Sequence, residues 1–186
     1  MNLKREFEKI LNNGSYFLPI RRNKKISYKN YYKKIIDPDG RLRILKDEKK
    51  EKIKQFKIIL NFLNNNKKKG TILDIGCGYG WMLSLLDKKK WETHGVELNK
   101  DCKEIAKRNM FKLYNKLSKV KKKFDVITMI HVIEHLRNPI IYLNNVKKLL
   151  KKNGTLIIET PDFDSAMARR YNLKFRLLHD PTHISL

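Results

Sequence analysis

Two hydrophobic patterns alternate along most of this chain. Short apolar runs typical of buried strands lie at 71–75, 93–97, 124–129 and 155–160, with a less well patterned run at 112–115. Between them, apolar residues recur three and four positions apart, as they do on the buried side of a helix. The clearest helical stretch begins at Asp47 and contains Ile53, Phe56, Ile59, Leu60 and Leu63. This order predicts an α/β fold with a doubly wound, mostly parallel sheet.

The remaining helices are predicted from the same spacing and from their end signals. One spans 81–86 with Met82, Leu85 and Leu86 buried, and another spans 101–110 with Cys102, Ile105, Ala106 and Met110 inward. Asn138-Pro139 predicts a helix start, because proline suits the first helical position. Lys151 and Lys152 are expected to close that helix before the glycine stop at Asn153-Gly154, and 165–171 also has a helical pattern.

The most distinctive stretch is the glycine turn after the first of these strands. Gly76, Gly78 and Gly80 alternate there, and Asp74 lies within the end of the strand. Glycine allows positive φ and lets a ligand approach bare backbone. The spacing is not the G-x-G-x-x-G of dinucleotide sites, and a carboxylate would repel a pyrophosphate. It would suit a ligand with ammonium and sulfonium charges, such as S-adenosylmethionine.

A second acid stands at the end of the next strand. Glu97 follows Gly76 by 21 positions, close to the interval at which an acid meets ribose hydroxyls in related folds. The carboxyl ends of parallel strands meet at one edge of the sheet. We therefore expect the glycine turn, Glu97, Ile130-His131 and Thr160 to converge on one crevice.

Four segments between 70 and 186 together resemble the class I S-adenosylmethionine-dependent methyltransferases: LDIGCGYG, GVELN, FDVITMIHVIEHL and LLKKNGTLIIETPD. The resemblance implies a Rossmann-like, three-layer domain over 46–186 with S-adenosylmethionine as cofactor. It implies that the methionine part lies against the glycine turn, the ribose against Glu97 and the adenine near Leu98. Asn115 stands where many family members have an acid facing the adenine. The implied cofactor-binding residues are Asp74, Gly76, Cys77, Gly78, Gly80, Glu97, Leu98, Asn115, Ile130 and His131.

Within the family, HVIEHL…NP and TPDFDSA…PTHISL look like bacterial enzymes that methylate sugars, polysaccharide precursors or quinone-like acceptors. Methyl transfer mainly requires alignment of acceptor, methyl and sulfur, and a weakly acidic acceptor also needs a base. His135 and His183 are the first candidates for that base, followed by His131, although a single histidine is more often structural.

The segment 131–135 matches two metal-binding patterns incompletely. Some ubiquinone-type and small-RNA 3′-end methyltransferases carry E-x-x-E-H here and bind a divalent ion, but His131 replaces the first acid, so no metal site is predicted. The H-x-x-E-H metalloprotease pattern needs both histidines on one helix, whereas this segment follows a strand. We therefore favour the methyltransferase interpretation.

The large net positive charge has little effect on the predicted function. The net charge of +24 would fit a nucleic-acid partner, and an RNA methyltransferase is the main alternative function, with an inactive cofactor-binding fragment as a third. However, lysine, asparagine and isoleucine are enriched together, as in 64–69, which an AT-rich coding bias would produce. We favour that simpler explanation.

The ends of the chain carry separate expectations. Residues 1–45 are basic and rich in tyrosine and are predicted to form an arm or lid. The first ten residues lack the apolar core of a signal peptide, no run reaches membrane-helix length, and Cys77 and Cys102 do not suggest a disulfide framework, so a cytoplasmic location is expected. The sequence stops where the family normally adds two more strands. We therefore expect these C-terminal strands to be missing and the exposed edge to favour a homodimer.

Overall fold

The computed structural model describes residues 42–44, 48–67, 69–162, 165–171 and 183–184, together with the backbone of three short strands near the start. These three are β1 (Glu8–Lys9) and β2 (Tyr16–Phe17), which pair antiparallel with each other, and β3 (Ile35–Ile36). Strand β3 pairs antiparallel with β4 (Leu42–Arg43), which lies in the range 42–44. Most of the predicted arm or lid at 1–45 lies outside the described residues, so its role stays a prediction.

The centre of the protein is a five-stranded sheet in which every neighbouring pair is parallel. The strands are β5 (Gly70–Ile75), β6 (Trp91–Val96), β7 (Lys112–Tyr114), β8 (Phe124–Ile130) and β9 (Leu150–Glu159). Their spatial order is β7-β6-β5-β8-β9. The predicted parallel sheet is confirmed, including the weakly patterned third strand.

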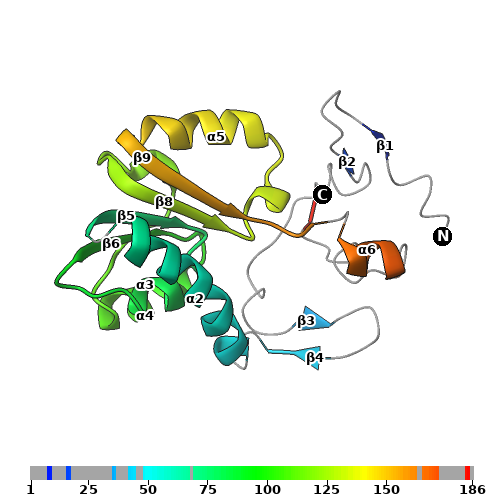
Figure 1. The fold of residues 1–186 in the computed structure, drawn as a ribbon, viewed down its shortest axis with the longest axis horizontal. Coiled ribbons are helices and arrows are strands. Elements are labelled where there is room, and N and C mark those ends of the chain that lie inside the picture. The colour runs from blue at the N-terminus through cyan, green and yellow to red at the C-terminus, as the bar shows by residue number, and fades with distance from the viewer. Residues whose placement is uncertain are drawn as a thin grey trace.

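Helices cover both faces of the sheet, as Figure 1 shows. On one face lie α2 (Lys49–Asn66), α3 (Trp81–Ser84) and α4 (Lys103–Arg108), and on the other lies α5 (Pro139–Lys148). A short helix, α6 (Ala166–Tyr171), follows β9. The three layers are those of the Rossmann-like fold.

Side-chain alternation along β5 divides the core in two. Ile72 packs with the helix residues Phe56 and Leu63, whereas Leu73 and Ile75 pack on the other side. This is the period of two that a strand buried on both faces requires. The second core also contains Val96, Phe124, Ile127, Met129 and Val146.

The two helices after β5 and β6 are shorter than the sequence indicated. The helix predicted at 81–86 ends at Ser84. Leu83 is buried, whereas Leu85 is 39% exposed, so the prediction of a buried Leu85 was wrong. The helix predicted at 101–110 consists of a 3₁₀ turn, η3 (Lys100–Cys102), and α4. Met110 lies beyond α4 with φ of 53° and is 75% exposed, so placing it inward was wrong.

The end of α5 also differs from the prediction. The helix stops at Lys148, and β9 begins at Leu150. An irregularity in the β8–β9 register follows, where Leu150 pairs with Phe124 but Thr155 pairs with Val126. Lys151 and Lys152 therefore lie in β9 and do not close the helix. The Lys151 ammonium forms an ion pair with the Asp125 carboxylate at 2.8 Å. Among the described helices, none is long and apolar enough to cross a membrane.

Candidate cofactor and acceptor site

The strand order creates a switch point beside β5. The chain first adds β6 and β7 on one side and then crosses to add β8 and β9 on the other. Ligands of such sheets bind outside the carboxyl ends of the strands at this point. The glycine turn follows β5, Glu97 follows β6, and Ile130-His131 ends β8, so the topology brings these predicted site residues to one edge.

Glycine is required in the turn by both conformation and packing. Gly76, Gly78 and Gly80 have φ of 72°, 51° and 66°, in the left-handed region that disfavours side chains. A Cβ atom on Gly76 would lie 2.5 Å from Cγ2 of Val132, and one on Gly80 would overlap the Phe111 ring. The amides of Gly76 and Cys77 both donate to the Val96 carbonyl, at 2.8 and 3.2 Å. The turn is thus held tightly against the end of β6.

Glu97 links this turn to the next loop. Its buried carboxylate accepts hydrogen bonds from the Gly78 amide at 3.0 Å and from the Asn99 amide at 2.8 Å. A carboxylate offers about four acceptor positions, of which these bonds use two. Leu98, the next residue, is 61% exposed. A buried acid beside an exposed apolar side chain fits a ribose joined to an adenine.

Asp74 is the second buried acid at this edge. Its Oδ1 accepts a hydrogen bond of 2.7 Å from the Thr128 hydroxyl. Burial raises the pKa of Asp74 to about 7; the Thr128 bond lowers it in part, and the charge of Glu97 raises it further. Two nearby buried acids stabilise a cationic ligand, so the residues present fit a cofactor with ammonium and sulfonium charges.

Three further predicted cofactor residues lie at or just after the carboxyl ends of strands. The Cys77 thiol is buried, and its pKa is raised well above the usual value, chiefly by burial, so a packing role suits it better than reactivity. Its sulfur fills the space that a Cβ atom on Gly95 would need. Ile130 ends β8, and Asn115 directly follows β7. Their contacts with a cofactor stay predictions.

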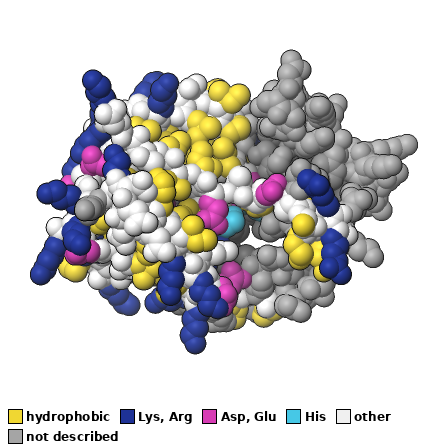
Figure 2. Space-filling view, in the orientation of Figure 1, with side chains coloured by type: hydrophobic (Ala, Val, Ile, Leu, Met, Phe, Trp, Pro, Cys, Tyr) yellow, Lys and Arg dark blue, Asp and Glu magenta, His cyan; other side chains and the backbone are white. Residues whose placement is uncertain are grey.

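His131 lies between two carboxylates. Its Nδ1 is 3.4 Å from Oε1 of Glu134, and its Nε2 is 3.6 Å from Oε1 of Glu159. The backbone of His131 has φ of 53°, and its amide donates to the Glu159 carbonyl at 2.8 Å. The left-handed conformation turns the chain out of β8 and aims the imidazole at the acids. On the face of the molecule that Figure 2 displays, a histidine side chain lies near the middle with acidic side chains beside it.

His135 and His183 meet although 48 positions separate them in the sequence. Their ring centroids are 4.9 Å apart. The Ile184 amide donates to the Glu134 carbonyl at 2.9 Å, which fastens residues 183–184 to the 3₁₀ turn η5 (Ile133–His135). The contact brings together the two histidines that the sequence analysis named first as candidate bases, and their role stays a prediction.

Glu134 is the residue that sequence reasoning missed. It is 2% exposed, and its Oε2 accepts from the Thr160 hydroxyl at 3.2 Å. Among the described residues its Oε1 has no hydrogen-bond partner, and the His131 Nδ1 approaches it to 3.4 Å. Burial by itself would raise the pKa of Glu134, but His131, a backbone hydrogen bond and the charge of His135 together outweigh that effect and hold the pKa below its usual value. The available signal was its position between His131 and His135 in the same short segment.

The side chains of Glu134, His135 and His183 each offer a ligand atom within 4.8 Å of the others. Two imidazoles and a carboxylate could hold a divalent transition-metal ion, or they could serve as a proton acceptor and its partners. The metalloprotease pattern is not realised, because His131 lies in a loop and 133–135 form a 3₁₀ turn.

Comparisons with known proteins agree with this geometry. A family model described as a methyltransferase domain matches residues 47–186. A ubiquinone biosynthesis O-methyltransferase from Pelagibacter ubique (strain HTCC1062) is 32% identical over 139 residues, which cover 67% of this chain and 58% of that protein. The chain thus spans little more than half the length of this relative.

Solved structures share the fold. A coclaurine N-methyltransferase bound to N-methylheliamine and SAH superposes with a TM-score of 0.51 and 19% identity, over 58% of this chain and 34% of that one. DesVI of Streptomyces venezuelae gives a TM-score of 0.51 and 18% identity, over 60% of this chain and 51% of the other. At these identities the similarity concerns the fold alone.

Proposed function

This chain belongs to the class I S-adenosylmethionine-dependent methyltransferases, and from that membership we propose that it methylates a hydroxyl group of a small acceptor molecule. The buried Glu97 carboxylate, which closes the glycine turn through the Gly78 amide, supports the cofactor part of this proposal. The observation that carries the acceptor part is the cluster of Glu134, His135 and His183, which offers a base to a hydroxyl group. A quinone-like phenol is the favoured acceptor, because the 32%-identical relative is named a ubiquinone biosynthesis O-methyltransferase. A sugar hydroxyl is the second choice.

The glycine turn and the two buried acids would hold the cofactor. We assign the methionine part to the turn from Gly76 to Gly80 and to Asp74, the ribose to Glu97 and the adenine to Leu98. When bound, S-adenosylmethionine supplies a methyl group on a positively charged sulfur. The chain contributes the alignment of acceptor, methyl and sulfur, which is the main requirement of this displacement.

The histidine cluster would serve the acceptor. Residues 183–184 close over η5, so His135 and His183 lie together beside Glu134. We propose that His135, which is half-buried, takes the proton from the acceptor hydroxyl, and that the buried Glu134 carboxylate stabilises the imidazolium that results. His183 packs against His135 and limits the positions of its ring.

Treatment with a chelator distinguishes the proposed role of His135 as a base from a metal-dependent mechanism. A histidine base works without a divalent ion, so turnover should be unchanged after dialysis against EDTA. Loss of turnover with EDTA, restored by Mn²⁺ or Zn²⁺, would instead assign Glu134, His135 and His183 to metal binding.

Transfer of a labelled methyl group tests the function itself. The protein is incubated with methyl-labelled S-adenosylmethionine and a panel containing catechols, monosaccharides and a short single-stranded RNA. We expect label on a catechol or sugar oxygen and none on RNA. Label on RNA alone would reject the small-molecule acceptor, and binding of S-adenosylhomocysteine with no transfer to any acceptor would support an inactive cofactor-binding module.

A further inference from the structure

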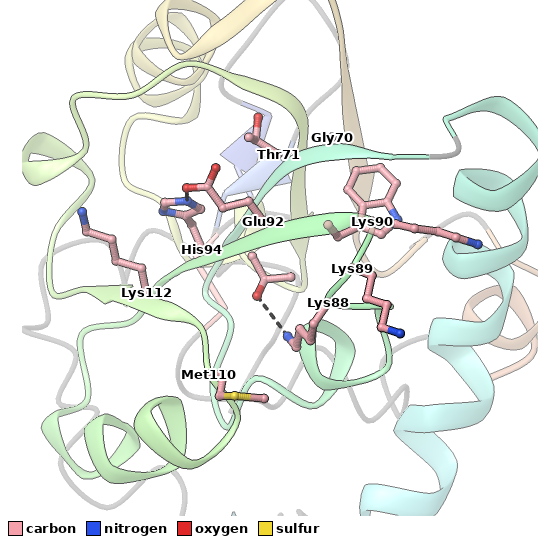
Figure 3. Close-up of a pocket in the computed structure, with 11 residues that line it drawn as sticks. Gly70, Thr71, Lys88, Lys89, Lys90, Glu92, His94, Met110 and Lys112 are labelled. Carbon is pink, nitrogen blue, oxygen red and sulfur yellow. Dashed lines mark hydrogen bonds and ion pairs between the residues drawn. The ribbon is translucent and has the colours of Figure 1, made fainter.

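A hollow lies at the amino-terminal ends of the strands, where β5, β6 and β7 begin. It encloses about 570 Å³ and is shown in Figure 3. Its lining includes the first residues of β5, the start of β6 and the connection between α3 and β6. Since the cofactor site lies at the carboxyl ends of the strands, this hollow is separate from it.

The hollow carries an excess of positive charge. Four of its lining residues are lysines: Lys88, Lys89, Lys90 and Lys112. Lys90 lies 3.8 Å from Asp87, and the Glu92 carboxylate is already bonded to Lys122 and His94. Within the described part of the chain, Lys88, Lys89 and Lys112 have no carboxylate as an ion-pair partner. The acids described near the hollow are therefore already paired, and none of the described carboxylates is an ion-pair partner of these three ammonium groups.

Lys88 differs from an ordinary surface lysine because its ammonium group is fixed in place. It donates to the Leu83 carbonyl at 2.9 Å and to the Thr93 hydroxyl at 3.0 Å, and the second bond is the dashed line in Figure 3. Both acceptors are neutral. Burial lowers the pKa of Lys88, which reflects the cost of a partly desolvated cation. An anion in the hollow would relieve that cost and accept the third ammonium hydrogen.

We propose that this hollow binds the phosphate groups of an anionic ligand, with Lys88 as the central cation and Lys89 and Lys112 at its rim. A phosphate group presents several charged oxygens and can accept from more than one ammonium, whereas one carboxylate would neutralise a single lysine. The rim lysines are exposed and can turn toward a ligand. The proposal concerns binding only, so it stands or falls independently of methyl transfer.

The test compares three single substitutions that remove the same charge. Lys88→Gln and Lys112→Gln alter the hollow, and Lys147→Gln alters an exposed lysine near the end of α5 on the other face of the sheet. Inorganic tripolyphosphate is titrated calorimetrically into each protein. We expect the dissociation constant to rise about tenfold for Lys88→Gln, since one charge-assisted hydrogen bond is lost, a few-fold for Lys112→Gln and under about twofold for Lys147→Gln.

If all three substitutions weaken the affinity for tripolyphosphate equally, net charge alone explains the effect and the proposal is overturned. It is also overturned if the unaltered protein shows no saturable binding. Circular dichroism checks the fold, and if Lys88→Gln unfolds, the comparison of Lys112→Gln with Lys147→Gln decides. A single-stranded oligonucleotide identifies the source of the phosphate. If the affinity for the oligonucleotide is weakened by Lys88→Gln and falls steeply with salt, the ligand is a nucleic acid. If Lys88→Gln weakens the binding of tripolyphosphate but not of the oligonucleotide, the ligand is a small phosphorylated molecule.

Discussion

The Thr128 hydroxyl donates a 2.7 Å hydrogen bond to Oδ1 of Asp74. The two residues are register partners on the neighbouring strands β5 and β8, and both are buried. The bond crosses the point where the strand order reverses, so it ties the two halves of the sheet together and fixes the carboxyl group beneath the glycine turn.

Removing the charge of Asp74 should stabilise the protein at neutral pH. The folded-state pKa of about 7 lies above the ordinary aspartate value of 3.8, so between these values the folded protein holds a proton that the unfolded chain has lost. Stability must then fall as pH rises through this window, by up to about 4 kcal/mol. Asp74→Asn should flatten the dependence of Tm on pH between about 4 and 7 and weaken cofactor binding. A variant with the same pH profile as the unaltered protein would contradict the assignment.

Filling the space at Gly76 should damage the turn for two separable reasons. Gly76→Ala introduces a Cβ atom against Val132 and forces alanine to adopt φ of 72°. We expect a loss of roughly 1–3 kcal/mol in the free energy of unfolding, measured by urea denaturation. The double variant with Val132→Ala removes the overlap but not the backbone strain. It should lose less than the sum of the two single variants, and strict additivity would show that the contact has no energetic role.

The histidine cluster should affect turnover rather than cofactor affinity. His135→Ala should lower kcat roughly 10²- to 10⁴-fold, the usual contribution of a general base, and leave the affinity for S-adenosylhomocysteine within about twofold. Glu134→Gln should shift the acid limb of the pH–rate profile to lower pH, because a neutral amide stabilises the imidazolium less. Unchanged kcat in His135→Ala would remove it from the reaction.

At the other end of β8, Asp125 should stabilise the fold against acid. Burial by itself would raise its pKa, but the Lys151 ammonium and the Thr71 amide and hydroxyl lower it to about 2. A lowered folded-state pKa gives stability that is present above the unfolded value of about 4 and is lost as pH falls toward 2. Asp125→Asn should cost about 1–2 kcal/mol at pH 6 and much less near pH 2. Lys151→Gln is the matched control and should reproduce part of this loss.

Much of the fold was predictable because buried parallel strands leave a strong signal. The glycine turn, the strand ending at Glu97 and the apolar run at 124–129 fixed the order of elements and the edge where the ligand-binding residues meet. Helix ends were less predictable. Met110 and Leu85 fit a helical period, but their helices stop earlier, so both side chains are exposed.

The acceptor side of the site was only partly visible in the sequence. The meeting of His135 with His183 depends on residues 183–184 folding back onto η5, and no local pattern encodes that contact. Glu134 was overlooked because a glutamate normally faces solvent, whereas here it is 2% exposed. The basic hollow at the start of the strands was also hidden, since its lysines come from separate segments and resemble the general lysine excess.

Calorimetric titration of S-adenosylhomocysteine into the protein and its Glu97→Gln variant tests the central claim most directly. Glu97→Gln keeps the size of the side chain but weakens its acceptance from ribose hydroxyls and from the Gly78 amide. Glu92→Gln, an acid at the opposite end of β6, is the matched control. The account predicts one saturable site, an affinity loss of about tenfold or more for Glu97→Gln and little change for Glu92→Gln. No saturable heat, or equal affinities in all three proteins, would contradict it.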